Sequence, residues 1–171
     1  MELEFLDTNS LFILNNITDT SIKKRIMREF NPLLENSLKP SINMDYDKKL
    51  PVITIEDINY SSFNIYSFII DKSYPFRPPS VFINSIPYIE FCRINTIGFC
   101  KNLKKVSNIY CFCCNTIIHT TKWTPTTKIY DIIVEIRNFK KIRRDVINKI
   151  FIDVIKRKYL NKDIEIYSWL F

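Results

Sequence analysis

The chain has 171 residues, of which 46% are hydrophobic and 14% aromatic, and its formal net charge is +7. This length and apolar content are sufficient for one compact domain with a core. The sequence has no uncharged apolar stretch of about 18 residues, and acidic residues stand where a signal peptide has basic ones, so an intracellular protein without a membrane span is predicted. Gly98 is the only glycine, which excludes glycine-rich phosphate loops.

A local basic cluster is formed by Lys140, Lys141, Arg143 and Arg144. Such clusters can bind nucleic acid or acidic proteins. No motif that interleaves aromatic and basic residues accompanies this one. The cluster is therefore interpreted as a solvated helix face, and nucleic acid is not an expected partner.

The first helix is predicted from Ser21, because apolar residues recur after it at helical spacing. Asp19 or Thr20 can cap its N-terminus. Pro32 is expected to limit or kink it. The apolar positions are Ile22, Ile26 and Phe30.

After Pro40 the pattern changes from helical spacing to alternation of apolar and polar residues, which is typical of strands. Four short runs follow one another closely, so the sequence predicts an antiparallel meander of four strands. The runs are residues 42–46, 52–55, 63–70 and 81–83.

Residues 86–122 show no clear period, and this segment is predicted to be mostly irregular. Helical structure should resume at Trp123, because Thr124 suits the N-cap and Pro125 the first helical position. A further helix is predicted over residues 145–159. The apolar face of the first of these helices comprises Ile129, Ile132, Ile133, Ile136 and Phe139. In the second, Ile147, Ile150, Phe151 and Val154 are expected to point inward.

These elements predict an α+β fold with an N-terminal helix, a four-stranded antiparallel meander and C-terminal helices. We expect a single domain over residues 1–171. Its core should span about residues 21–160, and residues 1–20 should form an N-terminal extension.

The segment YPFRPP, residues 74–79, contains three prolines and two aromatic residues. Proline lacks an N–H group and fixes φ, so this segment can be neither the interior of a helix nor a central strand. The residue before each proline is also held extended. The sequence therefore predicts a rigid extended crossing between two strands.

All five cysteines fall within residues 92–114. An odd number in one short window argues against a disulfide framework spread through the fold. Clustered cysteines of an intracellular chain are often ligands or nucleophiles, although a buried cysteine can also serve as a small hydrophobic residue. One tetrahedral zinc ion could be bound by four ligands taken from Cys92, Cys100, Cys111, Cys114 and His119.

The order of the predicted elements along the chain, and several local motifs, resemble those of a ubiquitin-conjugating enzyme. The first helix, KKRIMREFNPLLEN, is similar to the family's first helix, and YPFRPP resembles the family's Y-P-F-K-P-P crossing. The segment HTTKWTPTTKIYDIIVEI resembles the family's W-S-P motif and the helix that follows it. The resemblance covers roughly residues 21–139.

The resemblance implies that a cysteine carries ubiquitin, or a ubiquitin-like modifier, as a thioester and passes it to a lysine. The family's spacing before the tryptophan falls on Asn115, so the adjacent Cys114 is the expected nucleophile and Cys113 the second choice. The implied partners are the modifier, an activating enzyme and a ubiquitin ligase. No cofactor is expected, because only the activating enzyme uses ATP. Expected partner-binding residues are Lys23, Lys24 and Arg28, and expected structural residues are Tyr74, Pro75, Pro78, Pro79, Trp123 and Pro125.

The chain departs from the family in lacking its H-P-N motif before the cysteine, whose asparagine is thought to stabilise the oxyanion. The single histidine, His119, follows the cysteines. The alternative is therefore a catalytically inactive adaptor with the same fold, with or without a structural zinc ion in the cysteine cluster. A cytoplasmic location is expected from the absence of a signal peptide and a membrane span. This divergence and the abundance of Ile, Asn and Lys resemble proteins of large DNA viruses, in which case the cell would be an infected host cell.

Overall fold

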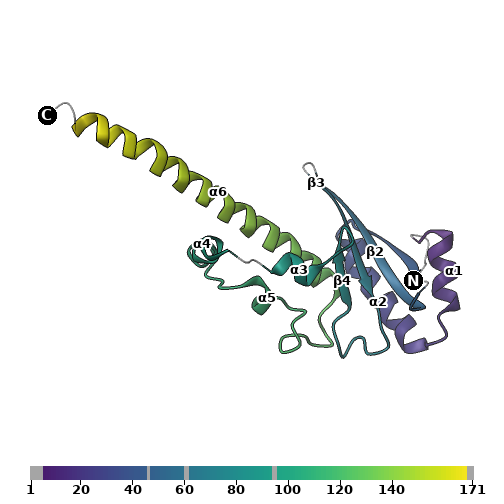
Figure 1. Cartoon of the computed structure of the whole chain (residues 1–171). Coiled ribbons are helices and arrows are strands. Elements are labelled where there is room, and N and C mark those ends of the chain that lie inside the picture. Colours follow the sequence, from purple (N-terminus) through teal and green to yellow (C-terminus); the bar gives the residue numbers. More distant parts are fainter. Residues whose placement is uncertain (1–5, 46, 60–61, 94–95, 169–171) are drawn as a thin grey trace. The chain divides into compact units, whose positions relative to one another are not determined.

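The computed structural model describes residues 6–45, 47–59, 62–93 and 96–168 (Figure 1). It is an α+β structure with an antiparallel sheet and helices before and after it. The helices are α1 (Thr8–Asn16), α2 (Thr20–Glu35), α3 (Tyr88–Cys92), α4 (Ile97–Ser107), α5 (Phe112–Asn115) and α6 (Ile129–Ser168). The strands are β1 (Lys39–Asp45), β2 (Leu50–Asn59), β3 (Ser62–Ile69), β4 (Ser80–Ile83) and β5 (Ile86–Pro87).

The chain divides into two compact units, neither of which is continuous in sequence. The first unit contains residues 1–92 and 116–135, and thus the sheet, α1, α2, α3 and the first turns of α6. The second contains residues 93–115 and 136–171, and thus α4, α5 and the rest of α6. The single domain expected over residues 1–171 stays a prediction.

The predicted meander is confirmed, with strand order β1-β2-β3-β4-β5 and every neighbouring pair antiparallel. Strand β5 was not predicted; it has two residues, and its Ile86 pairs with Ile83 of β4. One face of the sheet is buried, as the alternation predicted. Its buried apolar residues are Ile42, Ile53, Ile55, Tyr66, Phe68, Val81 and Ile83.

Helix α2 begins where its capping residue predicted. The carboxylate of Asp19 accepts hydrogen bonds from the backbone N–H groups of Ser21 and Ile22, and hydrogen bonds in this cap lower the pKa of Asp19. The predicted apolar positions Ile22, Ile26 and Phe30 are buried. Pro32 does not end the helix, which continues to Glu35.

The segment expected as an N-terminal extension contains a helix, α1. Asp7 caps it by accepting from the N–H group of Ser10 at 2.7 Å. The hydroxyl of Ser10 in turn accepts from the backbone N–H of Ile42 on β1 at 2.9 Å. The helix thus satisfies a donor on the edge strand of the sheet, where an unpaired N–H would otherwise be available to another chain.

The prediction of an irregular segment over residues 86–122 was wrong, because this segment contains β5, α3, α4 and α5. These helices are short, with 5, 11 and 4 residues for α3, α4 and α5. Periodicity is a weak signal in helices of about three turns or fewer. The sequence pattern therefore could not separate them from loops.

The start of the next helix was predicted four residues too early. Residues 124–127 form a turn in which the Thr124 hydroxyl contacts the hydroxyls of Thr126 and Thr127, and the N–H of Thr127 bonds the carbonyl of Thr124. Helix α6 begins at Ile129. Threonine side chains that bond locally compete with the helix in this way, so Pro125 occupies a turn and not the first helical position.

The prediction of two C-terminal helices was also wrong, because α6 is one helix of 40 residues. Lysine, arginine and isoleucine fill the predicted break between residues 139 and 145, and none of these interrupts a helix. Of the residues expected to point inward, Ile147, Phe151 and Val154 are exposed. No helix in the described part of the chain is both long and apolar enough to cross a membrane.

Candidate active site

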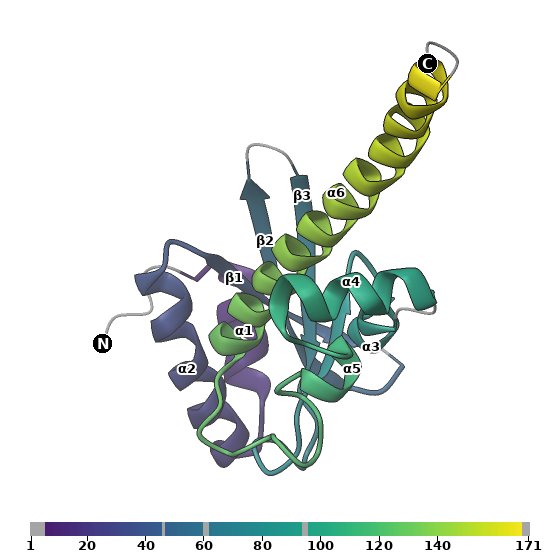
Figure 2. The ribbon, with the colours of Figure 1, turned by 90° about the vertical axis from the view of Figure 1, so that its left-hand side faces the viewer.

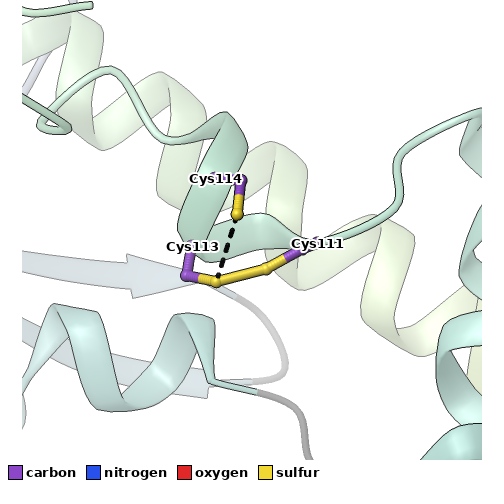
Figure 3. Close-up of side chains that lie close together, drawn as sticks. All are labelled: Cys111, Cys113 and Cys114. Atoms are coloured by element: carbon purple, nitrogen blue, oxygen red, sulfur yellow. Dashed lines mark hydrogen bonds between the residues drawn. A yellow bond between two sulfur atoms is a disulfide. The ribbon is translucent and has the colours of Figure 1, made fainter. Parts of the chain in front are cut away.

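The predicted nucleophile, Cys114, lies in α5 in the second unit. Cys113 lies beside it in α5, and Cys111 lies just before this helix. Cys111 and Cys113 form a disulfide, and Cys114 lies outside it and is exposed. Figure 3 shows the sulfur of Cys114 pointing toward that of Cys113, 3.8 Å away. The three Sγ atoms all lie within 4.8 Å of one another.

Two contacts within the second unit hold this short helix. Phe112 is fully buried and its ring stacks on Phe139 of α6, with centroids 4.4 Å apart. The side-chain amide of Asn115 donates to the carbonyl oxygen of Cys111 at 2.8 Å. The residues between and beside these anchors are the cysteines. Their backbone is therefore fixed by an aromatic contact and a hydrogen bond as well as by the disulfide.

The residues directly after α5 are fixed in the first unit by one carboxylate, that of Glu135 on α6. It accepts from the Thr116 hydroxyl at 2.6 Å, from the Ile117 N–H at 2.8 Å and from the Tyr88 hydroxyl at 2.9 Å. Burial raises the pKa of Tyr88, and the nearby thiol of Cys92 and carboxylate of Glu135 raise it further. Tyr88 therefore stays a neutral hydrogen-bond donor.

A second carboxylate, that of the buried Glu29 on α2, joins three segments of the first unit. It accepts from the Tyr74 hydroxyl and from the Ile129 N–H, each at 2.8 Å. Arg25 Nε lies 2.8 Å from Glu29 Oε1 as an ion pair, although its N–H lacks hydrogen-bond geometry toward any acceptor. Figure 2 shows α2 beside the start of α6, which these contacts connect.

The proline crossing and the W-T-P motif are in contact. Both were identified in the sequence as motifs that resemble the same family. Trp123 donates its indole N–H to the carbonyl oxygen of Pro75 at 2.7 Å, and its ring centroid lies 6.1 Å from that of Tyr74. Tyr74 and Trp123 are buried. Burial and the Glu29 carboxylate raise the pKa of Tyr74. The peptide bond between Tyr74 and Pro75 is cis.

The other prolines singled out by sequence occupy different environments. Pro79 is buried, Pro78 is half-buried and Pro125 is exposed. The burial of Pro79 fits a structural role in the crossing. The exposure of Pro125 follows from its place in the turn before α6.

The remaining candidate zinc ligands are divided between the two units. Cys92 is buried and His119 is exposed, and both belong to the first unit. His119 Nδ1 lies 2.8 Å from the Thr121 hydroxyl. Cys100 lies on α4 in the second unit and is not part of the cluster of three. The cluster instead includes Cys113, which the proposed zinc ligands omitted.

The predicted basic face of α2 is partly accessible. Lys24 and Arg28 are exposed, while Lys23 is half-buried and donates to the side-chain oxygen of Asn15 at 3.1 Å. Arg25, on the same helix, forms an ion pair with Glu29 and donates to the carbonyl oxygen of Thr127 at 2.9 Å. Its guanidinium also lies over the ring of Tyr74. Lys24 and Arg28 are therefore the cations best placed for an acidic partner.

Sequence reasoning missed Glu29, Glu135 and Arg25. Each is a single charged residue on a helix, and such side chains are usually exposed to solvent. The available signal was position, because Arg25, Glu29 and Glu135 immediately precede the buried residues Ile26, Phe30 and Ile136. That signal does not identify their partners.

Chemically, the cluster offers one exposed thiol beside a disulfide. A thiolate is a strong nucleophile toward thioesters and disulfides and a soft metal ligand. With the disulfide reduced, the same segment would present three thiols. Acyl transfer, thiol exchange and metal binding are all within the reach of this side-chain set.

The comparisons with known proteins add no relative. No protein-family model matches the chain, and no match was found among the curated proteins or the solved structures searched.

Proposed function

We propose that the chain carries ubiquitin, or a ubiquitin-like modifier, on Cys114 as a thioester and transfers it to a lysine amine. The observation that carries this proposal is the position of Cys114, an exposed thiol outside the disulfide, on a helix whose flanking residues are anchored. The meander, the contact between Trp123 and Pro75 and the resemblance of the motifs support the same proposal.

The reaction is an exchange of thioesters followed by aminolysis. The Cys114 thiolate attacks the carbonyl carbon of the thioester at the activating enzyme, a new C–S bond forms, and the enzyme's cysteine leaves as a thiolate. A lysine amine then attacks the new thioester, the C–S bond breaks, and an amide forms with loss of one proton from the amine. An activated thioester and a nucleophilic thiolate need no catalytic triad.

One consequence of the missing H-P-N motif is a slower reaction. Removing one oxyanion donor from other acyl-transfer sites costs about 100-fold to 1000-fold in rate, or about 3–4 kcal/mol. The nearest asparagine, Asn115, already donates to Cys111. We therefore expect charging of Cys114 to be detectable but slow compared with an enzyme that has the motif.

Incubation with activating enzyme, ubiquitin and ATP tests the proposal. The wild-type chain should form an adduct that thiol reductant removes, because a thioester is cleaved by thiols. Cys114→Ser should form at most a reductant-resistant oxyester. Cys113→Ser should still form the reductant-sensitive adduct, and Cys100→Ser is the matched control within the same unit. An adduct that is lost with Cys113→Ser and kept with Cys114→Ser would move the role to Cys113.

A non-catalytic adaptor is the second candidate, favoured by the absence of an H-P-N motif and by the use of the Asn115 amide within α5. In that case the reduced, folded chain would form no adduct with any ubiquitin-like modifier. It should still bind the modifier or a ligase. Binding in a pull-down with purified components, without charging, would therefore identify the adaptor.

Reversing two charges on α2 tests the partner surface. In the double variant Lys24→Glu and Arg28→Glu, charging by the activating enzyme should slow by about tenfold, because opposite charges at an interface mainly set the association rate. The melting temperature should stay unchanged, since both side chains are exposed. The same reversal at Lys156 and Arg157, exposed on α6, is the control. If the wild type and both double variants were charged at equal rates, the basic face of α2 would be a solvated surface without a role in charging.

A further inference from the structure

The three sulfur atoms at α5 have a spacing that suits a metal ion. In a tetrahedral zinc site with Zn–S bonds of about 2.3 Å, two sulfur ligands lie about 3.8 Å apart. The Sγ atoms of Cys113 and Cys114 are 3.8 Å apart, and all three lie within 4.8 Å (Figure 3). Cys111 and Cys113 are closer than this, because they are bonded as a disulfide.

Reduction of the disulfide would therefore leave three thiols on a segment that other contacts already hold. The buried ring of Phe112 is stacked on Phe139, and the Asn115 amide bonds the carbonyl of Cys111. Neither contact involves a sulfur atom. The backbone positions of the three cysteines should thus persist when the S–S bond is broken, and Cys111 Sγ has only to rotate away from Cys113 Sγ.

We propose that the reduced chain binds one Zn²⁺ ion through the thiolates of Cys111, Cys113 and Cys114. This set differs from a closed structural zinc site, because among the described residues no fourth cysteine, histidine or carboxylate belongs to the cluster. Three protein ligands leave the fourth position to solvent or to an added thiol. Cys114 is exposed, so solvent can reach the cluster and supply the fourth ligand.

Two consequences follow from the ligand set. Metal binding displaces the thiol protons, so the affinity should rise with pH. Oxidation to the Cys111–Cys113 disulfide removes two of the three ligands and should abolish binding. Metal binding and acyl transfer also compete for the Cys114 sulfur. This competition rests on the proposed function, whereas the metal site itself is independent of it.

The test uses the full chain, reduced with a phosphine so that no added thiol binds the ion. Zinc is titrated in competition with a chromophoric chelator, and Co²⁺ is added in a parallel sample to detect the absorption band of thiolate–cobalt bonds. We expect one equivalent of Zn²⁺ in the reduced protein and none in the oxidised protein, a comparison that needs no variant. Reduced protein that binds no zinc would overturn the proposal.

Variants then assign the ligands. Loss of an outer residue that only supports a metal ligand costs about 10-fold to 100-fold in metal affinity, so Cys113→Ser should weaken binding by at least about tenfold. Cys100→Ser, a cysteine of the same unit outside the cluster, should bind as the wild type does. If both substitutions weaken binding equally, the ion is bound elsewhere and the proposal is wrong. Circular dichroism of each variant establishes that it is folded.

Charging separates this proposal from the proposed function. If both are correct, the metal-free protein forms the ubiquitin adduct, Zn²⁺ blocks it, and a chelator restores it. If zinc binds with the expected ligands and the metal-free protein never charges, the acyl carrier is wrong and the metal site stands. If charging proceeds at the same rate with one equivalent of bound zinc, Cys114 is not a ligand and the proposed site is wrong.

Discussion

Replacing Glu29 with alanine should lower the free energy of unfolding by about 3–5 kcal/mol, the usual cost of removing one partner from a buried ion pair. Glu29 is only 1% exposed. Its removal would leave the charge of Arg25 without its ion-pair partner, and the hydroxyl of Tyr74 and the N–H of Ile129 without the acceptor that they share. Chemical denaturation of the full chain measures the effect.

The matched control is Glu35→Ala, which removes an exposed carboxylate from the same helix. Its cost should lie within about 0.5 kcal/mol, as for other surface substitutions. Glu29→Gln should fall between the two, because glutamine keeps one acceptor oxygen but loses the charge. If Glu29→Ala cost no more than Glu35→Ala, the buried network would contribute nothing to the stability of the fold.

The network at Glu29 illustrates what the sequence could not predict. The contacts of Glu29 reach Tyr74 and Ile129, 45 and 100 residues further along the chain. Nothing local to Glu29 indicates either partner. By contrast, the Asp19 cap and the alternation in the strands are short-range patterns, and both predictions are confirmed.

Helix α6 shows the opposite failure, in which a local pattern was taken too far. Two apolar periodicities, one ending at Phe139 and the other beginning after Asp145, were interpreted as two helices, with the basic stretch of residues 140–144 between them. Lysine and arginine are good helix formers, so the backbone continues through that stretch. The exposure of Ile147 and Phe151 shows that apolar spacing along a helix need not mean burial.

The cysteine cluster lies between these cases. The sequence analysis singled out this segment as a candidate for a nucleophile or a metal site, and Cys111, Cys113 and Cys114 are close in space. The pairing of Cys111 with Cys113 was not predicted. Whether two cysteines separated by one residue can meet depends on the local backbone, here the turn into α5, and sequence spacing alone does not determine it.

Replacing Glu135 with alanine should lower the free energy of unfolding by about 2–4 kcal/mol, because buried donors that lose their acceptor cost about 1–3 kcal/mol each. The Tyr88 and Thr116 side chains are fully buried, and the N–H of Ile117 is the third donor. The control is Glu56→Ala, an exposed carboxylate in the same unit, for which we expect a change within about 0.5 kcal/mol.

The amide of Ile117 offers a local measurement. In the wild type this N–H is bonded to Glu135 at 2.8 Å and should exchange slowly with solvent deuterium. In Glu135→Ala it should exchange faster, because local opening then costs less free energy. Unchanged exchange would mean that packing, and not Glu135, holds the segment.

Glu135→Gln distinguishes the charge from the hydrogen bonds. A glutamine can place its oxygen toward the Ile117 N–H and its amide toward the two hydroxyls, which can accept as well as donate. We therefore expect Glu135→Gln to cost about 1 kcal/mol and to keep the Ile117 amide protected. Because Cys114 lies two residues before Thr116, the alanine variant should also slow the charging of Cys114 while the glutamine variant retains it. Equal charging by both variants would show that acyl transfer does not depend on how the segment after α5 is anchored.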